Sequence, residues 1–279
     1  MIIGIDLGGT NVRAAIENDG AIQNFRKEPF NTKVSLDETL TQLKEFIRPL
    51  VGNGVRGIGI GVPSVVDVEK GIVLNVTNIP AWKRVPLKDI LEAEFKIPVC
   101  VNNDVNCFAL GEHQFGNLRG MKNVVGVSIG TGLGSGIIIN DRLFEGVNCG
   151  AGELGLLPYL DQNIEYYASG NLFKVKFNTT AHEANNRAAE GDPQAVEQWE
   201  EFGKHVGEAI KCVAYAYDPE AIVLGGSLSK AFRFFNESMH QSMLNFEFPE
   251  SINRLRVFQS TDDNITVLGA AALVHRLLR

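Results

Sequence analysis

Short apolar runs alternate with amphipathic segments along the first 120 residues. Three apolar runs, separated by turns at 8–10 and 18–20, predict an antiparallel meander with strands at 2–7, 11–16 and 21–27. Ser35 followed by Glu38 is a capping-box pattern, and leucines and isoleucines at helical spacing predict a helix after it. Beyond it we expect strands at 57–62 and 98–101 and helices at 88–95 and 103–115. This order is typical of an α/β domain with a mixed sheet.

The second half of the chain repeats part of this pattern. A glycine-rich turn at 130–136 separates expected strands at 123–129 and 137–139, as the turn at 8–10 separates the first two strands. After it we expect a third short strand, a long helix at 193–217, strands at 221–224 and 256–258, and helices at 232–244 and 265–278. The repeated strand–turn–strand unit predicts two related α/β lobes that face a cleft.

Composition and charge exclude several classes of protein. The 279 residues carry 26 basic and 33 acidic side chains, and the net charge of −7 argues against a protein that mainly binds nucleic acid or anionic membrane. No signal peptide is visible, and no apolar run reaches the ~18 residues of a membrane span. The four cysteines form no Cys-x-x-Cys pair, so we expect buried free thiols in a cytoplasmic protein. The five histidines are expected to be surface or packing residues.

Glycine is the unusual component, with 29 residues against a usual share of ~7%. Nine of them gather around three turns: Gly8, Gly9, Gly130, Gly132, Gly134, Gly136, Gly152, Gly225 and Gly226. Glycine lets the backbone come close to an anion and point its N–H groups at it. We interpret the surplus as close approach of the backbone to a polyphosphate.

The first of these turns follows an acid at a strand end. Asp6 precedes Gly8, Gly9, Thr10 and Asn11, whose backbone and side-chain donors are candidates for binding phosphate. Asp6 is a candidate for orienting Mg²⁺ through water, because Mg²⁺ keeps several of its waters in proteins. The alternative interpretation is an ordinary glycine hairpin turn, since short glycine motifs are common.

The second and third turns extend this interpretation. The segment that begins Gly130-Thr131-Gly132 is not a Walker loop, and a strand rather than a helix follows it, so it is not a Rossmann fingerprint. Two glycine turns between strands suggest two hairpins that bind phosphate. Residues 225–227, Gly-Gly-Ser, end a strand and open a helix, which suits a nucleotide's base and sugar or a simple tight turn.

Three carboxylates, Asp104, Glu153 and Glu165, are candidates for contact with a substrate. Asp104 opens a helix, where the dipole favours an anion, and is a candidate base for a substrate hydroxyl. Alternatively, Asn103 or Asp104 merely caps the helix. Glu153 and Glu165 follow the second glycine turn and either accept bonds from vicinal sugar hydroxyls or are solvated loop charges.

In this order the motifs resemble the ROK family of sugar kinases, which have the actin-like ATPase, ribonuclease H-like fold. The resemblance spans essentially the whole chain and is carried by residues 3–14, 61–67, 77–82, 103–112, 130–136 and 218–226. It implies an α/β protein of two lobes with mixed sheets around a central cleft. The smaller lobe would be 1–116, rejoined by the C-terminal helix 265–279, and the larger would be 117–264.

The resemblance also implies a reaction, namely ATP-dependent transfer of the γ-phosphoryl group to a hexose hydroxyl, usually the 6-hydroxyl. It makes Asp104 the catalytic base, ATP and Mg²⁺ the cofactors, and a homodimer the expected assembly. The sugar would contact Ser64, Asn78, Asn103, Asp104, Glu153 and Glu165. The nucleotide would contact Gly8, Gly9, Thr10, Asn11, Gly130, Thr131, Gly132, Gly225, Gly226 and Ser227, with Asp6 placing Mg²⁺.

The sequence departs from the family pattern at one place. Many members carry a histidine where Leu156 stands here, followed by a zinc-binding cysteine loop, whereas 157–163 contain no cysteine. We therefore predict no zinc site. The missing histidine removes an expected contact near the 1- and 2-positions of the sugar, so N-acetylhexosamines and fructose stay open beside glucose.

Two non-catalytic interpretations stay open as well. One is a sugar-responsive repressor, but such members carry a helix-turn-helix ahead of the first phosphate motif, which begins here at residue 2. The other is a sugar sensor that has lost activity.

Overall fold

The computed structural model describes residues 1–277, which form two compact units that are described separately here. The first unit comprises Met1–Arg119, Leu143–Ala151 and the segment that begins at Asp262, and the second comprises Gly120–Arg142 and Gly152–Thr261. The segment Leu143–Ala151 thus groups with the first unit, whereas we expected all of 117–264 in the second lobe. Residues 278 and 279 of the expected C-terminal helix lie outside the described residues.

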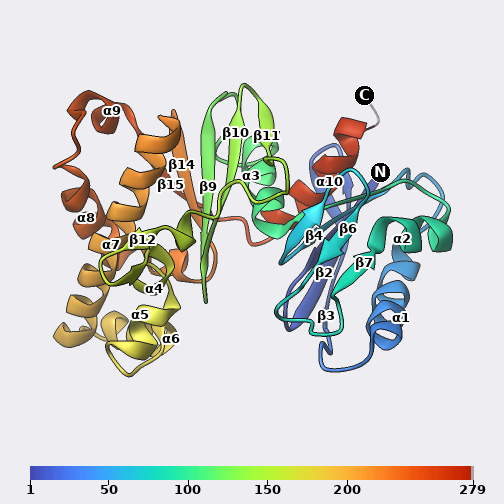
Figure 1. Ribbon diagram of the computed structural model, residues 1–279, viewed down its shortest axis with the longest axis horizontal. Coiled ribbons are helices and arrows are strands. Elements are labelled where there is room, and N and C mark those ends of the chain that lie inside the picture. Colours follow the sequence, from blue (N-terminus) through green and yellow to red (C-terminus); the bar gives the residue numbers. More distant parts are fainter. Residues whose placement is uncertain (278–279) are drawn as a thin grey trace. The chain divides into compact units, whose positions relative to one another are not determined.

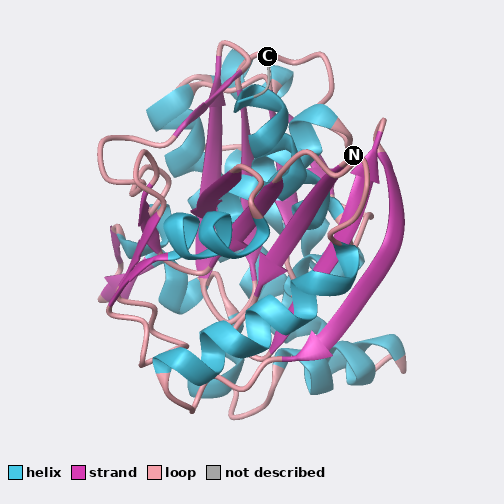
Figure 2. Cartoon of the chain, turned by 90° about the vertical axis from the view of Figure 1, so that its right-hand side faces the viewer, coloured by secondary structure: helices cyan, strands magenta, loops and turns pink. Residues whose placement is uncertain are grey.

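The first unit is built on a five-stranded mixed sheet in the order β3-β2-β1-β4-β8 (Figures 1 and 2). Its strands are β1 (Ile2–Leu7), β2 (Asn11–Asn18), β3 (Ala21–Pro29), β4 (Ile58–Val62) and β8 (Val99–Asn103). The first three pair antiparallel as the predicted meander, and β1, β4 and β8 run parallel. The structure therefore confirms a mixed α/β sheet.

Helices cover both faces of this sheet. Ile3, Ile5 and Leu7 alternate to one face, where they share a core with α1 (Leu36–Ile47). On the opposite face lie α3 (Asp104–Gln114) and α10 (Ile265–Leu277), the apolar C-terminal helix. Apolar residues cover α10 nearly all round because it is buried along most of its length.

Two glycines of the sheet serve packing rather than phosphate binding. A Cβ on Gly4 would collide with the carbonyl oxygen of Val267, and one on Gly59 would collide with that of Ala270. Both carbonyls belong to α10, so the helix can lie against the sheet only where side chains are absent. Part of the glycine surplus is thus explained by helix-to-sheet contact, which corrects our interpretation that polyphosphate explains the surplus.

A small three-stranded sheet in the first unit was missed by the sequence pattern. It consists of β5 (Val65–Asp67), β6 (Ile72–Leu74) and β7 (Arg84–Pro86), followed by α2 (Leu87–Phe95). Strands of three residues are too short to show an alternating pattern. Trp82, fully buried beside this sheet, donates its Nε1–H to Thr39 Oγ1 at 2.7 Å and so ties the segment to α1.

The second unit contains most of a five-stranded sheet in the order β11-β10-β9-β14-β15, and of β11 only Arg142 is assigned to this unit. Its strands are β9 (Val124–Ile129), β10 (Leu133–Ile139), β11 (Arg142–Phe144), β14 (Ala221–Gly225) and β15 (Arg256–Gln259). β10 begins at Leu133, so the expected turn at 130–136 is wrong beyond residue 132. The physical reason is that Gly134 and Gly136 pair in the ladder with Ser128 and Gly126.

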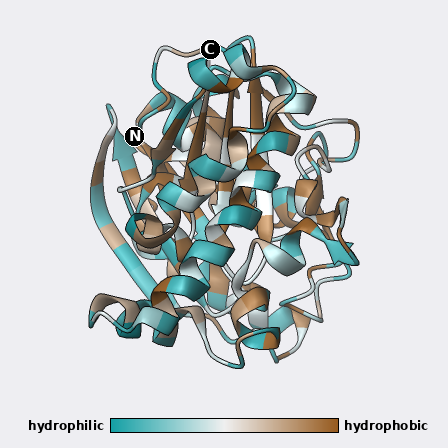
Figure 3. Cartoon of the chain, turned by 90° about the vertical axis from the view of Figure 1, so that its left-hand side faces the viewer, coloured by the Kyte–Doolittle hydropathy of each residue, from teal (hydrophilic) through white to brown (hydrophobic). Residues whose placement is uncertain are grey.

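Two long helices pack together in this unit, α7 (Pro193–Tyr217) and α8 (Phe232–Met243). Their outward surfaces are hydrophilic, whereas the strands behind them are hydrophobic (Figure 3). Shorter elements that the pattern missed are α4 (Ile164–Tyr167), α5 (Gly170–Val175), α6 (Ala181–Ala189), α9 (Pro249–Arg254) and the β12–β13 hairpin (Pro158–Tyr159, Gln162–Asn163). The signal for α6 was present, because Thr180 and Glu183 form a capping box. Among residues 1–277, no helix is both long and apolar enough to span a bilayer.

Candidate functional site

In the first unit, the register of the parallel strands brings several predicted residues to one edge of the sheet. Asp6 of β1 lies opposite Gly61 of β4, which lies opposite Asn102 of β8. The next residues along these strands lead into Ser64 and Asn103, and Asn103 Nδ2 donates to the carbonyl oxygen of Ser64 at 3.3 Å. Asp6, Ser64 and Asn103 thus lie at or just beyond the same sheet edge.

Asp6 forms an ion pair that the sequence did not reveal. Arg13 lies directly across the β1–β2 ladder and contacts Asp6 Oδ2 with Nη2 at 2.5 Å and with Nε at 3.0 Å. Arg13 Nη1 also donates to the carbonyl oxygen of Asp263 at 2.6 Å. The two contacts that Arg13 makes with Asp6 use the same carboxylate oxygen, Oδ2. Water-mediated binding of Mg²⁺ by Asp6 therefore fits best through Oδ1.

The first glycine turn is closed by its own backbone. The N–H of Gly8 donates to the carbonyl oxygen of Asn11 at 2.9 Å, and Asn11 Nδ2 donates to Thr10 Oγ1 at 3.0 Å. A Cβ on Gly9 would lie 3.0 Å from the Cβ of Asn78, so this glycine and the exposed Asn78 are neighbours. The N–H of Gly8 is engaged inside the hairpin. Because the N–H of Gly8 is engaged, the phosphate-binding role expected of this turn would fall to the residues at its tip, Gly9 and Thr10.

The structure assigns the helix cap at the start of α3 to Asn103. Its Oδ1 accepts the backbone N–H groups of Val105 at 2.9 Å and Asn106 at 3.2 Å. Asp104 is the first residue of the helix and is half-buried, with Oδ1 accepting the N–H of Val105 at 3.0 Å. The cap does not depend on Asp104, and its carboxylate lies in the first turn, where the helix dipole stabilises a negative charge.

A buried amide supports this turn from behind. Asn102 is 1% exposed, and its Oδ1 accepts the N–H of Asn103 at 2.8 Å and the Nδ2–H of Asn106 at 2.9 Å. Its own Nδ2 donates to Glu145 Oε1 at 2.5 Å. Glu145 belongs to the segment Leu143–Ala151, which explains why that segment groups with the first unit.

In the second unit, the glycine turn at 130–132 is held by the chain that follows α4. Gly130 donates its N–H to the carbonyl oxygen of Gly132 at 2.9 Å and accepts the N–H of Gly170, also at 2.9 Å. Ser169 Oγ donates to the carbonyl oxygen of Thr131 at 3.2 Å. These contacts fix the conformation of the turn, so the second predicted phosphate turn is a rigid hairpin.

Of the two predicted sugar carboxylates of the second unit, Glu165 contacts the end of this turn, and Glu153 lies near Glu165. Glu165 Oε2 accepts the N–H of Leu133 at 2.9 Å, and a Cβ on Gly132 would meet the same oxygen. Glu153 is exposed as a residue, but partial desolvation of its carboxyl group raises its pKa, and the nearby Glu165 carboxylate raises that pKa further. The two acids therefore face a common region, and Glu153 takes up a proton more readily than an ordinary glutamate.

Residues 157–163, where a zinc loop is absent from the sequence, form the β12–β13 hairpin. Within residues 1–277, no three His, Cys, Asp or Glu side chains gather as a metal-ligand set, and the absence of zinc stays a prediction. The cysteines are free thiols. Cys107 and Cys149 are buried as expected, whereas Cys100 and Cys212 are only half-buried.

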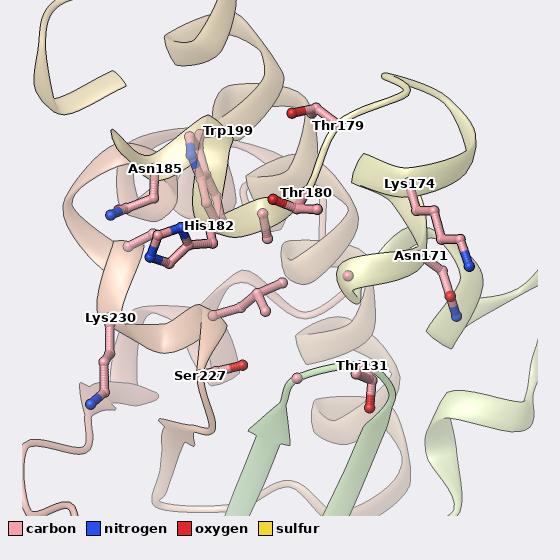
Figure 4. Close-up of a pocket in the computed structure, with 15 residues that line it drawn as sticks. Thr131, Asn171, Lys174, Thr179, Thr180, His182, Asn185, Trp199, Ser227 and Lys230 are labelled. Atoms are coloured by element: carbon pink, nitrogen blue, oxygen red, sulfur yellow. The ribbon is translucent and has the colours of Figure 1, made fainter. Parts of the chain in front are cut away.

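The second unit also contains a pocket of about 620 Å³ beside the glycine turn (Figure 4). Gly130, Thr131 and Ser227 line it, so the structure brings together predicted nucleotide residues from two distant segments. Gly226 shapes the turn beside it. Its φ of 82° is in the left-handed region, and a Cβ there would collide with the carbonyl oxygen of Ile129.

The pocket also contains residues that the sequence interpretation missed. They are Asn171 and Lys174 of α5, His182 and Asn185 of α6, and Lys230. His182 was expected to be a surface or packing residue, and neither its spacing nor its neighbours indicated a pocket. Lysine, amide and hydroxyl groups in a concave pocket of this size suit a polar, anionic small molecule such as a nucleotide.

Three comparisons place these features among known proteins. The sequence pattern of the ROK family matches residues 2–277. The glucokinase of Streptomyces coelicolor is 31% identical over 264 residues, which cover 82% of each chain. The xylose repressor of Caldicellulosiruptor bescii is 29% identical, over 98% of this chain and 77% of the repressor.

A solved structure shows the same fold. The ROK family glucokinase of Streptomyces griseus, in complex with glucose and AMPPNP, matches 99% of both chains with a TM-score of 0.83 and 26% identity. The predicted α/β architecture, of the actin-like ATPase type, is thereby confirmed. From the match over nearly its whole length, the chain belongs to the ROK family.

Proposed function

We propose that the protein is an ATP-dependent sugar kinase that phosphorylates a hexose hydroxyl, the 6-hydroxyl of glucose or of a related hexose. The observation that carries this proposal is the pocket of the second unit, where the glycine turn, Ser227 and two lysines surround a space of nucleotide size. The similarity to a glucokinase that binds glucose and AMPPNP supports the same assignment.

The nucleotide is proposed to lie in this pocket with its phosphates toward the glycine turn. Because the N–H of Gly130 is engaged within the turn, the proposed phosphate donors are the tip residues Thr131 and Gly132. Lys174 and Lys230 add positive charge to the lining, which favours a polyphosphate in a chain whose net charge is −7. Gly8, Gly9, Thr10 and Asn11 are the proposed phosphate contacts of the first unit.

Sugar contacts are proposed for each unit separately. In the first unit, Ser64, Asn78 and Asn103 would contact the sugar's hydroxyls, and in the second unit Glu153 and Glu165 would accept bonds from vicinal hydroxyls. Asp104 would take the proton of the attacking hydroxyl as the new O–P bond forms and the bond from the γ-phosphorus to the bridging oxygen of ADP breaks. Its place in the first turn of α3 stabilises the ionised carboxylate that this step requires.

Asp6 is proposed to hold Mg²⁺ through water. When bound, the ion would neutralise charge on the phosphates. The Asp6 carboxylate suits this role because Arg13 holds it in place through one oxygen. A cytoplasmic homodimer belongs to the proposal through the family resemblance alone.

A sugar-sensing regulator is the second candidate, and the match to a xylose repressor over 98% of this chain favours keeping it. An N-acetylhexosamine or fructose kinase is the alternative within the enzyme class. A panel of hexoses, N-acetylhexosamines, fructose and xylose in an ADP-release assay separates these proposals. Sugar-dependent ADP release supports a kinase and identifies its substrate, whereas sugar binding without ADP release supports the sensor.

A further inference from the structure

We propose that Tyr159, Tyr167 and His205, here called the aromatic brace, position the segment that carries Glu153 and Glu165. The inference rests on the proposed function in one respect, because it treats these glutamates as sugar ligands. The hydrogen bonds and ring contacts of these three side chains go to residues that are not proposed to bind substrate, so we treat the three as positioning residues. They lie on β12, at the end of α4, and on α7.

Direct contacts join the three rings. The hydroxyl of Tyr159 lies 3.0 Å from Nδ1 of His205, and these two rings meet edge to face with centroids 5.7 Å apart. The ring of Tyr167 lies 5.5 Å from that of Tyr159 and 4.9 Å from that of His205. Each ring therefore contacts the other two, and these contacts attach the hairpin and α4 to α7. Figure 1 shows the ribbons of β12, α4 and α7 that carry the three rings.

Besides these rings, the Tyr167 hydroxyl donates to Asp161 Oδ1 in the hairpin turn, and the leucines around the hairpin are exposed. Leu156, Leu157 and Leu160 are 60%, 43% and 69% exposed, so these leucines give the hairpin little burial of its own. The half-buried Tyr159 is the large hairpin side chain that turns toward α7. Because exposed leucines contribute little to stability, the hairpin is held mainly by the Tyr159–His205 contact and by the bond from Tyr167 to Asp161.

Hydrogen bonds transmit this fixation to Glu165. Tyr159 pairs with Gln162 in the hairpin, and the next residue, Asn163, caps α4 by accepting the N–H of Tyr166 at 2.8 Å. Glu165 is the second residue of α4, between the cap and Tyr167. The position of α4 is thus set from both ends, by the hairpin and by Tyr167.

Glu153 is linked to the other strand of the hairpin. The N–H of Leu156 donates to the carbonyl oxygen of Glu153 at 3.2 Å, and Leu157 donates to Leu154 at 3.1 Å. Leu157 in turn accepts the N–H of Ile164 at 3.1 Å, which closes the base of the hairpin. The segments that carry Glu153 and Glu165 therefore both join the hairpin at this hydrogen-bonded base.

The protonation states suit the bond at the centre of the brace. Burial lowers the pKa of His205, and burial raises the pKa of Tyr159 to about 12. At neutral pH the phenol keeps its proton and donates it to the unprotonated Nδ1. Nε2 of His205 then faces Glu201 at 3.7 Å, and Glu201 also pairs with Lys176 next to α5.

Tyr159→Phe tests the brace, because it removes the hydroxyl and keeps the ring. The matched control is Tyr217→Phe, which removes the hydroxyl of a second half-buried tyrosine that lies on α7 and not in the brace. We expect Tyr159→Phe to raise KM for the sugar about threefold to tenfold, the range for one lost hydrogen bond, with KM for ATP changed less than about twofold. Amide exchange should accelerate in 157–167 and stay unchanged in 206–217. His205→Gln, which keeps an acceptor, should restore part of the affinity that His205→Ala loses.

Two outcomes would overturn the proposal. One is an unchanged sugar KM together with unchanged exchange in 157–167. The other is an equal change in both KM values with uniformly faster exchange, which would indicate general destabilisation. If the wild-type protein phosphorylates no sugar, the proposed function fails, and the exchange pattern alone then decides whether the brace fixes this segment.

Discussion

The carboxylate of Glu165 accepts the backbone N–H of Leu133 at 2.9 Å, directly at the end of the glycine turn that lines the pocket. A proposed sugar ligand is thereby attached to the proposed nucleotide site within one unit of the chain. The same oxygen occupies the space that a side chain at Gly132 would need. The glycine is required by this packing as well as by any phosphate.

Glu165→Ala should therefore impair both substrates. We expect at least a tenfold rise in KM for the sugar, from the loss of charge-assisted bonds, and a smaller rise in KM for ATP as the turn loosens. Glu165→Gln keeps an oxygen for the N–H of Leu133. This variant should leave KM for ATP unchanged and still raise KM for the sugar. Steady-state kinetics with each substrate varied separately measures both effects, with Glu200→Ala on the exposed face of α7 as the control. Identical kinetics for the Ala and Gln variants would contradict the double role.

Arg13→Ala tests the ion pair with Asp6. The two side chains are 27% and 14% exposed, so removing the guanidinium leaves a partly buried carboxylate without its charged partner. We expect a loss of about 1–3 kcal/mol in the free energy of unfolding and a shift in the Mg²⁺ concentration needed for half-maximal activity. Urea unfolding and an Mg²⁺ titration measure these effects. Arg26→Ala, which breaks the more exposed pair with Glu28, should leave the Mg²⁺ midpoint unchanged. Equal midpoints for all three proteins would contradict the claim that the Arg13 pair prepares Asp6 to hold the ion.

Gly59→Ala tests the close contact between the sheet and α10. The added methyl group would collide with the carbonyl oxygen of Ala270, so the helix must shift, at a cost of about 1–3 kcal/mol or more. Gly52→Ala is the control, because a Cβ there meets nothing within 4 Å. Thermal unfolding should show a clear fall in Tm for the first variant and little change for the second. A Tm for Gly59→Ala equal to that of wild type would refute this packing account.

The pH dependence of stability should carry a signature of His205. Burial and Lys176 lower its folded pKa below the ordinary 6.5, while Glu201 and Glu208 oppose the shift, and Tyr159 and Tyr167 complete its surroundings. The unfolded chain then binds more protons, so stability is lost as the pH falls through about 6.5 toward the folded pKa. His205→Gln should flatten this part of the curve. Urea unfolding of both proteins between pH 5 and 8 makes the comparison, and parallel curves would exclude the histidine as the cause.

Much of the fold was predictable from periodicity, and the site was predictable only in part. The meander, α1, α7 and α10 have long apolar patterns or caps that a sequence displays directly. The β5–β7 sheet and the β12–β13 hairpin have strands of two or three residues, which show no period. Their conformation is set by contacts distant in sequence, such as Trp82 with Thr39 and Tyr159 with His205.

The site residues divide along the same line. Gly130, Thr131 and Ser227 belong to turns with a recognisable composition, and the structure places all three in one pocket. His182 and Lys174 line it from helices whose sequences look like ordinary polar surface. Arg13 was hidden for a similar reason, because only the antiparallel register places it opposite Asp6.

The central claim is that the chain phosphorylates a sugar with Asp104 as the base, and one measurement tests it most directly. ATP-dependent formation of a sugar phosphate is followed for the wild-type protein and for Asp104→Asn on the same sugar panel. The account predicts sugar phosphate with the wild type and about 10²-fold or greater loss of turnover in the variant, whose Asn103 cap and fold stay intact. Turnover near the wild-type rate by Asp104→Asn, or no sugar phosphate from the wild type with any sugar, would contradict it.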